Sequence, residues 1–267
     1  MQSKFLFPLL LYYHITLLLF MSGHSKWATT KRKKEKIDQK RGSAFTKLAN
    51  AISVAARSGA DPEMNFGLRL AIDRAKAVSM PKENIDRAIL RGSGGAGGAQ
   101  LSHTVYEGFL PCRQAGGPSS QVAFMIEAIS DNSNRTFNEL KHLFADHGGN
   151  LASPGAVGWM FERKGVIAVK NEKLKMNKEE LELKMIDFGA DDFSEGEDEI
   201  YIYTKPENLH ALKDGLEKEG IEIESAGVEY IAKEKIDVPP EAEEKLQKLI
   251  DELEEHQDVA EYFMNLK

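Results

Sequence analysis

The residues whose types point most clearly to a chemical function are the basic residues of positions 21–57. Their ammonium and guanidinium groups can neutralise phosphates and release counterions, which gives salt-dependent affinity for nucleic acid of any sequence. Trp27 lies among them, and its ring can stack on a base or anchor the segment by packing. The candidate nucleic-acid contacts are Lys26, Trp27, Lys31, Arg32, Lys33, Lys34, Lys36, Lys40, Arg41 and Lys47.

The charge distribution separates this segment from the rest of the chain. Residues 21–57 hold ten basic and two acidic residues, a net charge of +8, although the whole chain of 267 residues carries −7. Residues 96–267 carry −17. Because salt screens charges beyond roughly 8 Å, a local positive field can attract a polyanion despite the negative average. The asymmetry therefore predicts a nucleic-acid partner.

A lysine-rich run is also typical of a solvated or targeting tail. The position of this run favours binding, because it leads directly into three predicted helices. Apolar residues recur at helical spacing in residues 43–57 and 65–78, and a third helix begins at Pro81 and ends at Gly92. No single helix is apolar enough to be stable alone, so we expect a three-helix bundle, a common scaffold for nucleic-acid contact.

The sequence carries no recognised catalytic or metal-binding motif. C-x-x-C, H-E-x-x-H and G-x-S-x-G are all absent, and His142 and His147 are five residues apart, off a common helix face. Cys112 is the one cysteine, which excludes a disulfide framework, and we expect it to be a surface thiol in a loop beside Arg113. We therefore expect no enzyme, no cofactor, no metal and no small-molecule substrate.

The first twenty residues include an apolar run at positions 5–20. The run is short for a membrane span, which needs about 20 residues, and no A-x-A cleavage site follows it. We expect Met21 to be the true start and residues 1–20 to be a start-site artefact or an apolar extension. An uncleaved anchor and an ordered segment are the alternatives. The basic segment and the single cysteine favour a cytoplasmic protein that does not bind a membrane.

Beyond a flexible linker at residues 93–99, helices and strands alternate. We expect strands at 103–110 and 121–130, a helix at 134–147 with Phe137, Leu140 and Phe144 inward, and a hairpin at 156–170 turning at Lys164-Gly165. A helix at 178–188, a strand at 199–204, a helix at 206–219, a strand at 221–231 and a helical stretch from Pro240 follow.

Hairpins mixed with helices predict an α+β fold: an N-terminal basic three-helix bundle followed by two two-layer α/β modules. We expect the second module to be an insertion in the first, with the leading strands pairing with residues 221–231. The expected boundaries are 21–97 for the basic helical domain, 98–132 with 205–267 for the first module, and 133–204 for the second.

Several segments match one family in order. They are Met21-Ser-Gly-His-Ser-Lys-Trp-Ala, Arg41-Gly-Ser-Ala-Phe-Thr-Lys-Leu, Met80-Pro-Lys-Glu-Asn-Ile-Asp-Arg-Ala-Ile, Tyr106-Glu-Gly, Asp131-Asn-Ser-Asn-Arg-Thr, His147-Gly-Gly-Asn-Leu and Trp159-Met-Phe-Glu-Arg-Lys-Gly. Over about residues 21–240, the chain resembles the YebC/PmpR family.

The resemblance implies a helical N-terminal domain followed by two α/β domains, in agreement with the predicted architecture. It also implies a cytoplasmic DNA-binding transcriptional regulator, whereas mitochondrial relatives act as translational activators and bacterial relatives have been linked to the ribosome. The helical domain resembles the zinc-binding N-terminal domain of integrases in shape, but this chain has no cysteine pair to bind zinc there.

Two departures from the family concern positions near its motifs. Residues 109–121 replace a compact Gly-Pro turn with what we expect to be a longer hairpin loop, and Ser133 stands where the family often has arginine. In residues 131–136, the Asn and Asp side chains are expected to cap the following helix, which Gly148 ends. Asn134 and Arg135 are secondary candidates for contact with a phosphate or ribosomal RNA.

Three functions remain open on the sequence. The first is a regulator that binds promoter DNA, the second is a translation factor or translational activator bound to ribosomal RNA or the ribosome, and the third is a protein-interaction adaptor that uses the acidic residues 96–267. Phosphate contacts are alike on DNA and RNA, and no recognition helix for reading bases can be identified.

Overall fold

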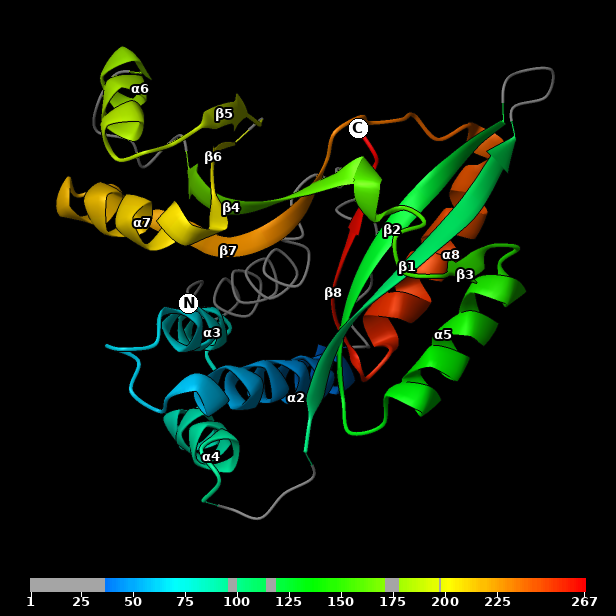
Figure 1. The fold of residues 1–267 in the computed structure, drawn as a ribbon, viewed down its shortest axis with the longest axis horizontal. Coiled ribbons are helices and arrows are strands. Elements are labelled where there is room, and N and C mark those ends of the chain that lie inside the picture. The colour runs from blue at the N-terminus through cyan, green and yellow to red at the C-terminus, as the bar shows by residue number, and fades with distance from the viewer. Residues whose placement is uncertain (1–36, 96–99, 114–118, 171–177, 197) are drawn as a thin grey trace, which may run out of the picture. The chain divides into compact units, whose positions relative to one another are not determined.

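The computed structural model describes residues 37–95, 100–113, 119–170, 178–196 and 198–267 (Figure 1). The chain divides into two units. The first unit comprises residues up to Phe161 together with Ala232–Lys267, and the second comprises Glu162–Ile231. The second unit is thus inserted in the sequence of the first. Among the described residues, no helix combines the length and apolar character that a membrane crossing requires.

The first unit begins with the predicted helical bundle, which the structure confirms. Its helices are α2 (Ile37–Ala55), α3 (Phe66–Ala77) and α4 (Lys82–Gly92), with a short 3₁₀ turn at Ala56–Ser58. Their shared core contains Ile52, Leu68, Ile72, Ala75, Val78, Met80, Ile85 and Ala88. Gly92 allows α4 to approach α2, because an added Cβ would lie 2.2 Å from the carbonyl oxygen of Ser53.

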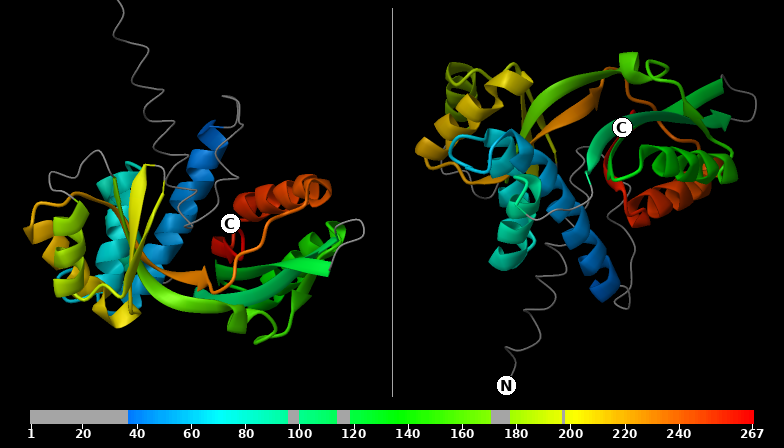
Figure 2. Two further views of the ribbon diagram at one scale, coloured as in Figure 1. Left: turned by 90° about the horizontal axis from the view of Figure 1, so that it is seen from above. Right: turned by 60° about the horizontal axis from the view of Figure 1, so that its bottom comes forward.

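The rest of the first unit is a four-stranded antiparallel sheet with two helices. The strands are β1 (Ser102–Arg113), β2 (Ser119–Ser130), β3 (Asn150–Ala152) and β8 (Val259–Met264), in the order β3-β1-β2-β8. The helices α5 (Ser133–Asp146) and α8 (Pro240–Glu255) lie side by side against this sheet (Figures 1 and 2). The core between these layers includes Phe124, Ile126, Leu140, Phe144, Leu249 and Leu253.

The second unit is another four-stranded sheet with two helices. Its strands are β4 (Phe161–Lys170), β5 (Asp192–Glu195), β6 (Glu199–Thr204) and β7 (Ile223–Ala232), in the order β5-β6-β4-β7. Its helices are α6 (Lys178–Asp187) and α7 (Leu209–Lys218), the latter preceded by a 3₁₀ turn at Pro206–Asn208. As the spacing predicts, Leu209, Leu212 and Leu216 are fully buried.

The strand pairing of the first sheet differs from the expectation. The strand expected to pair with β1 and β2 is β7, and it neighbours β4 in the second sheet. The partner of β2 is β8, which lies inside the stretch predicted to be helical from Pro240. Val259 and Phe263 are both buried and are four residues apart, a spacing that fits a strand as well as a helix. Because the spacing fits both kinds of element, the sequence pattern does not distinguish β8 from a continuation of the helix.

The expected module boundaries differ from the structure for the same reason. The structure groups α5 and β3 with the first sheet, and α7 and β7 with the second. Residues 133–161, expected in the second module, therefore belong to the first unit, and residues 205–231, expected in the first module, belong to the second unit. The predicted hairpin at 156–170 is wrong. Gly165 lies inside β4 opposite Thr204, and an added Cβ would lie 3.0 Å from side-chain atoms of both Thr204 and Leu209. The glycine serves close packing there and forms no turn.

Two side chains expected in other environments also require correction. Phe137 is 40% exposed, because it lies at the edge of the apolar stripe of α5, and its ring centroid is 6.3 Å from that of Tyr106. Cys112, expected in a surface loop, is fully buried in β1. The longer segment at 109–121 extends β1 and β2 as a paired ladder to Arg113 opposite Ser119, and α8 covers the added strands.

The buried position of Cys112 has a simple chemical consequence. Burial raises the pKa of the Cys112 thiol, which disfavours the reactive thiolate. We expect Ellman's reagent to leave the native protein unmodified over minutes and to titrate one thiol per chain once guanidinium unfolds it. Rapid stoichiometric modification of the native protein would contradict the burial of this side chain.

The glycine of the Tyr106-Glu107-Gly108 segment is required by packing. An added Cβ at Gly108 would lie 2.7 Å from Cε1 of Phe144, whose ring is fully buried. We expect Gly108→Ala to lower the free energy of unfolding by about 1–3 kcal/mol, because the core has no room for the methyl group. The measurement is urea-induced unfolding of the purified variants.

A second glycine provides the matched control for that substitution. Gly42 lies within α2, and an added Cβ there has nothing within 4 Å. Gly42→Ala is expected to raise the free energy of unfolding by about 0.4–1 kcal/mol, since it restricts the unfolded chain and suits a helix. Equal effects of the two substitutions would argue against the packing explanation for Gly108.

Candidate nucleic-acid interface

Most of the predicted nucleic-acid contacts lie outside the described residues. These are Lys26, Trp27, Lys31, Arg32, Lys33, Lys34 and Lys36. Lys40 and Arg41 lie in the first turns of α2, where the structure describes the backbone alone. The basic segment thus continues into the first helix of the bundle, and only Lys47 of the predicted set has a described side chain.

Lys47 makes an internal bond within the first unit. Its ammonium group donates to the main-chain carbonyl of Glu254 at 2.7 Å, which connects α2 with α8. Burial lowers the pKa of Lys47 to about 8, and the nearby Glu254 carboxylate partly opposes this shift. Lys47 would have to leave this bond to reach a phosphate, so its described position is that of a connection between the bundle and α8.

The arginines of the bundle divide between internal and exposed positions. Arg91 donates to the Ala49 carbonyl at 3.1 Å and to the Asn50 side chain at 2.9 Å, and thereby joins α4 to α2. Arg74 of α3 forms an ion pair with Glu261 of β8. By contrast, the side chains of Arg57 and Arg87 are exposed on the bundle.

The segment Asp131–Thr136 begins α5 in the way that its sequence predicts. The side chain of Asn132 accepts from the backbone N–H of Arg135 at 3.1 Å, a standard N-cap contact. At the other end of α5, Gly148 adopts a φ of +76°, the left-handed geometry expected for it. Asn134 is exposed in the first turn of α5.

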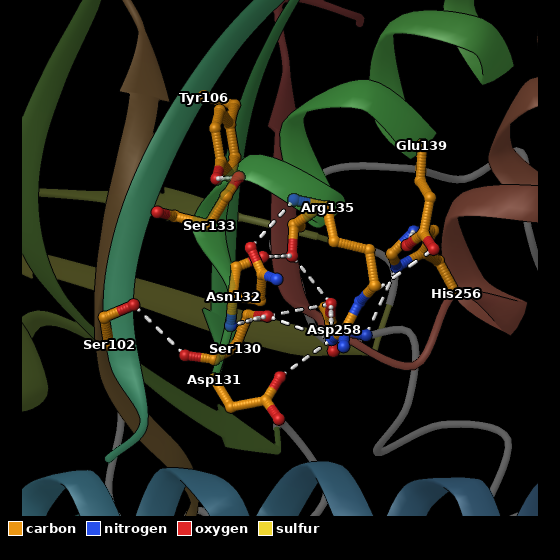
Figure 3. Close-up of polar contacts among 11 residues, drawn as sticks. Ser102, Tyr106, Ser130, Asp131, Asn132, Ser133, Arg135, Glu139, His256 and Asp258 are labelled. Carbon is orange, nitrogen blue, oxygen red and sulfur yellow. Dashed lines mark hydrogen bonds and ion pairs between the residues drawn. The ribbon is translucent and has the colours of Figure 1, made fainter. Parts of the chain in front are cut away.

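Asp258 organises a polar network around this helix start (Figure 3). Its Oδ2 accepts from the Thr136 hydroxyl at 2.7 Å, from the Arg135 guanidinium at 2.9 Å and from the Ser130 hydroxyl at 3.0 Å. Asp131 forms a second ion pair with Arg135 at 3.0 Å. Since Asp258 directly precedes β8, these bonds connect the end of β2 and the start of α5 to the last strand of the sheet.

The network fixes the ionisation of its two charged centres. Burial alone would raise the pKa of Asp258, but the hydrogen bonds from Arg135, Thr136 and Ser130 outweigh it and hold the pKa below its usual value. The hydrogen bond and charge of Asp258 raise the pKa of Arg135. The Arg135 side chain is 44% exposed, and its guanidinium also forms ion pairs with Asp131 at 3.0 Å and with Glu139 at 3.9 Å.

A further polar centre was missed at the sequence level. The Glu107 carboxylate is buried and accepts from the backbone N–H groups of Gly155, Val157 and Gly158 at 2.6, 2.7 and 2.8 Å. Burial disfavours the charge, but these hydrogen bonds outweigh burial and lower the pKa of Glu107. The Tyr106-Glu-Gly motif was a signal for this site, although the loop that it binds lies about fifty residues further along the chain.

The loop held by Glu107 carries Trp159, which is not among the contacts predicted from the sequence. Its side chain is 68% exposed. In the part of the chain that the structure describes, no group of three or more His, Cys, Asp or Glu side chains could hold a metal ion. Of the two aromatic side chains that are exposed in the described part of the first unit, Phe137 and Trp159, Trp159 is the more exposed.

The Asp258 network predicts a measurable loss of stability. Asp258→Asn keeps the shape of the side chain but removes the charge that three donors share, so we expect the free energy of unfolding to fall by about 1–3 kcal/mol near neutral pH. Because the folded-state pKa is depressed, the stabilisation by Asp258 is complete above the usual pKa of 3.8 and disappears as the pH falls through the lower folded-state value. The difference in the free energy of unfolding between the wild type and Asp258→Asn should therefore decrease at acidic pH.

The control for this prediction uses the other acidic partner of Arg135. The Asp131 side chain is 46% exposed, and exposed ion pairs contribute little. Asp131→Asn should change the free energy of unfolding by no more than about 0.5 kcal/mol in urea titrations at neutral pH. If the two substitutions cost the same, Asp258 is not the centre of the network.

Comparison with known proteins identifies the architecture around this site. The family model for the TACO1/YebC N-terminal domain matches residues 25–95, and the model for the TACO1/YebC second and third domains matches residues 101–266. A crystal structure of a conserved hypothetical protein from Aquifex aeolicus matches with a TM-score of 0.76 and 43% identity, covering 91% of this chain and 97% of that chain.

Curated relatives match over nearly the same length. A probable transcriptional regulatory protein of Thermoanaerobacter pseudethanolicus is 46% identical over 248 residues, which is 92% of this chain and 97% of the relative. One of Thermotoga maritima is also 46% identical over 248 residues, with 92% and 94% coverage. The helical bundle, the two sheets and the sequence matches across them agree, and the chain belongs to the TACO1/YebC family.

Proposed function

We propose that this protein is a non-enzymatic, cytoplasmic regulator of gene expression that binds DNA and acts on transcription. The observation that carries the proposal is the net charge of +8 on residues 21–57, a segment that continues into the first helix of the bundle. Such a charge supplies the phosphate contacts on which nucleic-acid affinity largely depends. The names of the relatives, probable transcriptional regulatory proteins, support the same role.

The basic residues of the bundle and of the segment before it fall into two groups, those with internal bonds and those proposed to contact phosphates. Arg74 and Arg91 are engaged with Glu261 and with α2, so they stabilise the folded unit. The basic run before α2, together with exposed Arg57 and Arg87, supplies the cations for phosphates. Binding of this kind tolerates any sequence, so target selection needs a further contact or a partner.

The test reverses the charge of the run from Lys31 to Lys34. Changing these four residues to Glu should weaken binding to a promoter-length DNA duplex and flatten the plot of log affinity against log salt. Each lost phosphate contact on B-DNA reduces the slope by about 0.9, so the slope should fall by about 2–4. Fluorescence anisotropy from 50 to 300 mM salt gives both quantities.

A matched variant separates local from overall charge. Lys141, Lys205, Lys218 and Lys245 are exposed and lie outside the basic segment, and changing these four to Glu alters the net charge by the same amount. This variant should keep most of the slope. If both variants lose the slope equally, or if neither does, residues 31–34 are not the contact surface.

Ribosome sedimentation distinguishes the DNA target from a ribosomal target. Transcriptional regulation predicts that the protein stays in the supernatant when ribosomes are pelleted from lysate at low salt, while promoter fragments are protected in footprinting. Co-sedimentation that is lost only at high salt, without footprints, would replace the DNA target with ribosomal RNA. Co-sedimentation or protein capture that is unaffected by the Lys31–Lys34 reversal would favour an adaptor that uses its acidic residues.

A further inference from the structure

Trp159 is the exposed aromatic side chain of a loop that the fold holds in place. It lies in a 3₁₀ turn, Gly158–Met160, between the buried side chains of Val157 and Phe161. Its indole Nε1 donates to the carbonyl of Ala156 at 3.0 Å, which fixes the orientation of the ring while 68% of the side chain stays exposed. A large aromatic side chain oriented in this way costs little further entropy on binding.

The backbone of this loop is already committed to Glu107. The N–H groups of Gly155, Val157 and Gly158 donate to the Glu107 carboxylate, and Gly155 adopts a φ of +88° that suits a glycine. A run of loop amides is often an anion site, but here an internal carboxylate fills it. The contact group that the loop offers to a ligand is therefore the indole ring.

A cation is bonded to the main chain of Trp159. The ammonium group of Lys233 donates to the carbonyl oxygen of Trp159 at 2.8 Å, and the backbone N–H of Lys233 donates to the Met160 carbonyl at 2.9 Å. An ammonium group has three N–H donors, so the bond to Trp159 leaves others for an anion. The Lys233 side chain is exposed. Trp159 and Lys233 together place an aromatic face and a positive charge on one short stretch of surface.

We propose that Trp159 and Lys233 form a second nucleic-acid contact, in which the indole stacks on an unpaired base and Lys233 binds the adjoining phosphate. The proposal rests on the proposed function and specifies a single-stranded segment as the ligand of this site. Stacking on an aromatic ring with a neighbouring cation is the usual arrangement for single strands, since every base has a π-face.

The surroundings of Trp159 favour a base over an apolar protein surface. The neighbouring residues Ser153 and Pro154 are exposed and form no helix or strand. Three other large apolar side chains are exposed in the described part of the first unit. Met64 lies in the turn before α3, Leu90 in α4 and Phe137 in α5. A single ring with a lysine beside it gives a protein partner little apolar area to bury, but it suffices for one base.

The experiment uses the fact that the chain has two tryptophans. The full-length Trp27→Phe variant leaves Trp159 as the single source of indole fluorescence. Its binding to 20-nucleotide oligo(dT) and oligo(rU), and to a DNA duplex of equal length, is measured by anisotropy of a labelled nucleic acid. Trp159 emission is recorded in the same titrations. We expect the single strands, but not the duplex, to quench Trp159 emission at the concentrations where anisotropy rises.

Substitutions in the wild-type background test the energetic role. Trp159→Ala should weaken single-strand binding about tenfold and leave duplex binding within twofold, whereas Trp159→Phe should retain most of the single-strand affinity. Lys233→Gln should weaken binding two- to threefold and reduce the salt slope. Circular dichroism and urea unfolding establish that each variant is folded, and the quenching of Trp159 emission decides the result if the Ala variant is not folded.

The outcomes separate this inference from the proposed function. If single strands bind but neither Trp159 emission nor the Trp159 variants respond, the Trp159 site is overturned while nucleic-acid binding stands. If no nucleic acid binds at 50 mM salt, both the proposed function and the Trp159 site are overturned. If Trp159 variants lose affinity for duplex and single strand alike, the ring does not stack on an unpaired base, and the proposal is overturned.

Discussion

The carboxylate of Asp258 is the interaction on which the first unit depends. It lies just before β8, and it receives donors from the end of β2 and from the first turn of α5. A half-buried carboxylate is unfavourable unless several donors neutralise it, and here two hydroxyls and a guanidinium do so. The Asp131–Thr136 motif therefore has a structural role, because it connects the start of α5 to the residue that precedes the last strand of the sheet.

Glu107 applies the same physical principle to a loop. Three backbone N–H groups surround its carboxylate, and the loop that supplies them carries Trp159 on its outer side. The burial of a charge thus fixes the position of an exposed ring. In both cases a carboxylate that is largely withdrawn from solvent orients a side chain that is partly or mostly exposed, Arg135 in one case and Trp159 in the other.

The sequence predicted much of this structure wherever the signal was local. Helical spacing identified the three helices of the bundle, and the capping role of Asn132 and the left-handed Gly148 followed from neighbouring residues. The prediction failed where the deciding partner is remote. Nothing near Asp258 indicates its bonds to Ser130 and Arg135, which lie more than 120 residues earlier in the chain.

The errors in the expected fold have the same origin. Cys112 is buried because α8 covers an extended hairpin, and β8 pairs with β2 although its apolar spacing also fits a helix. The charge of Lys47 predicts a contact with nucleic acid, whereas its ammonium group binds the Glu254 carbonyl. Charge counts indicate a polyanion partner, but burial decides which cations can reach it.

The split of the first unit around the second has a consequence for synthesis of the chain. Residues 162–231 form a continuous unit, whereas β2 must wait for β8, which is made after that whole unit has emerged. On the translating ribosome, the second unit can fold while the first still exposes an unpaired strand edge. The pairing of β8 with β2 is a long-range contact, and such contacts form slowly, so it is expected to be a late step in maturation of the nascent protein.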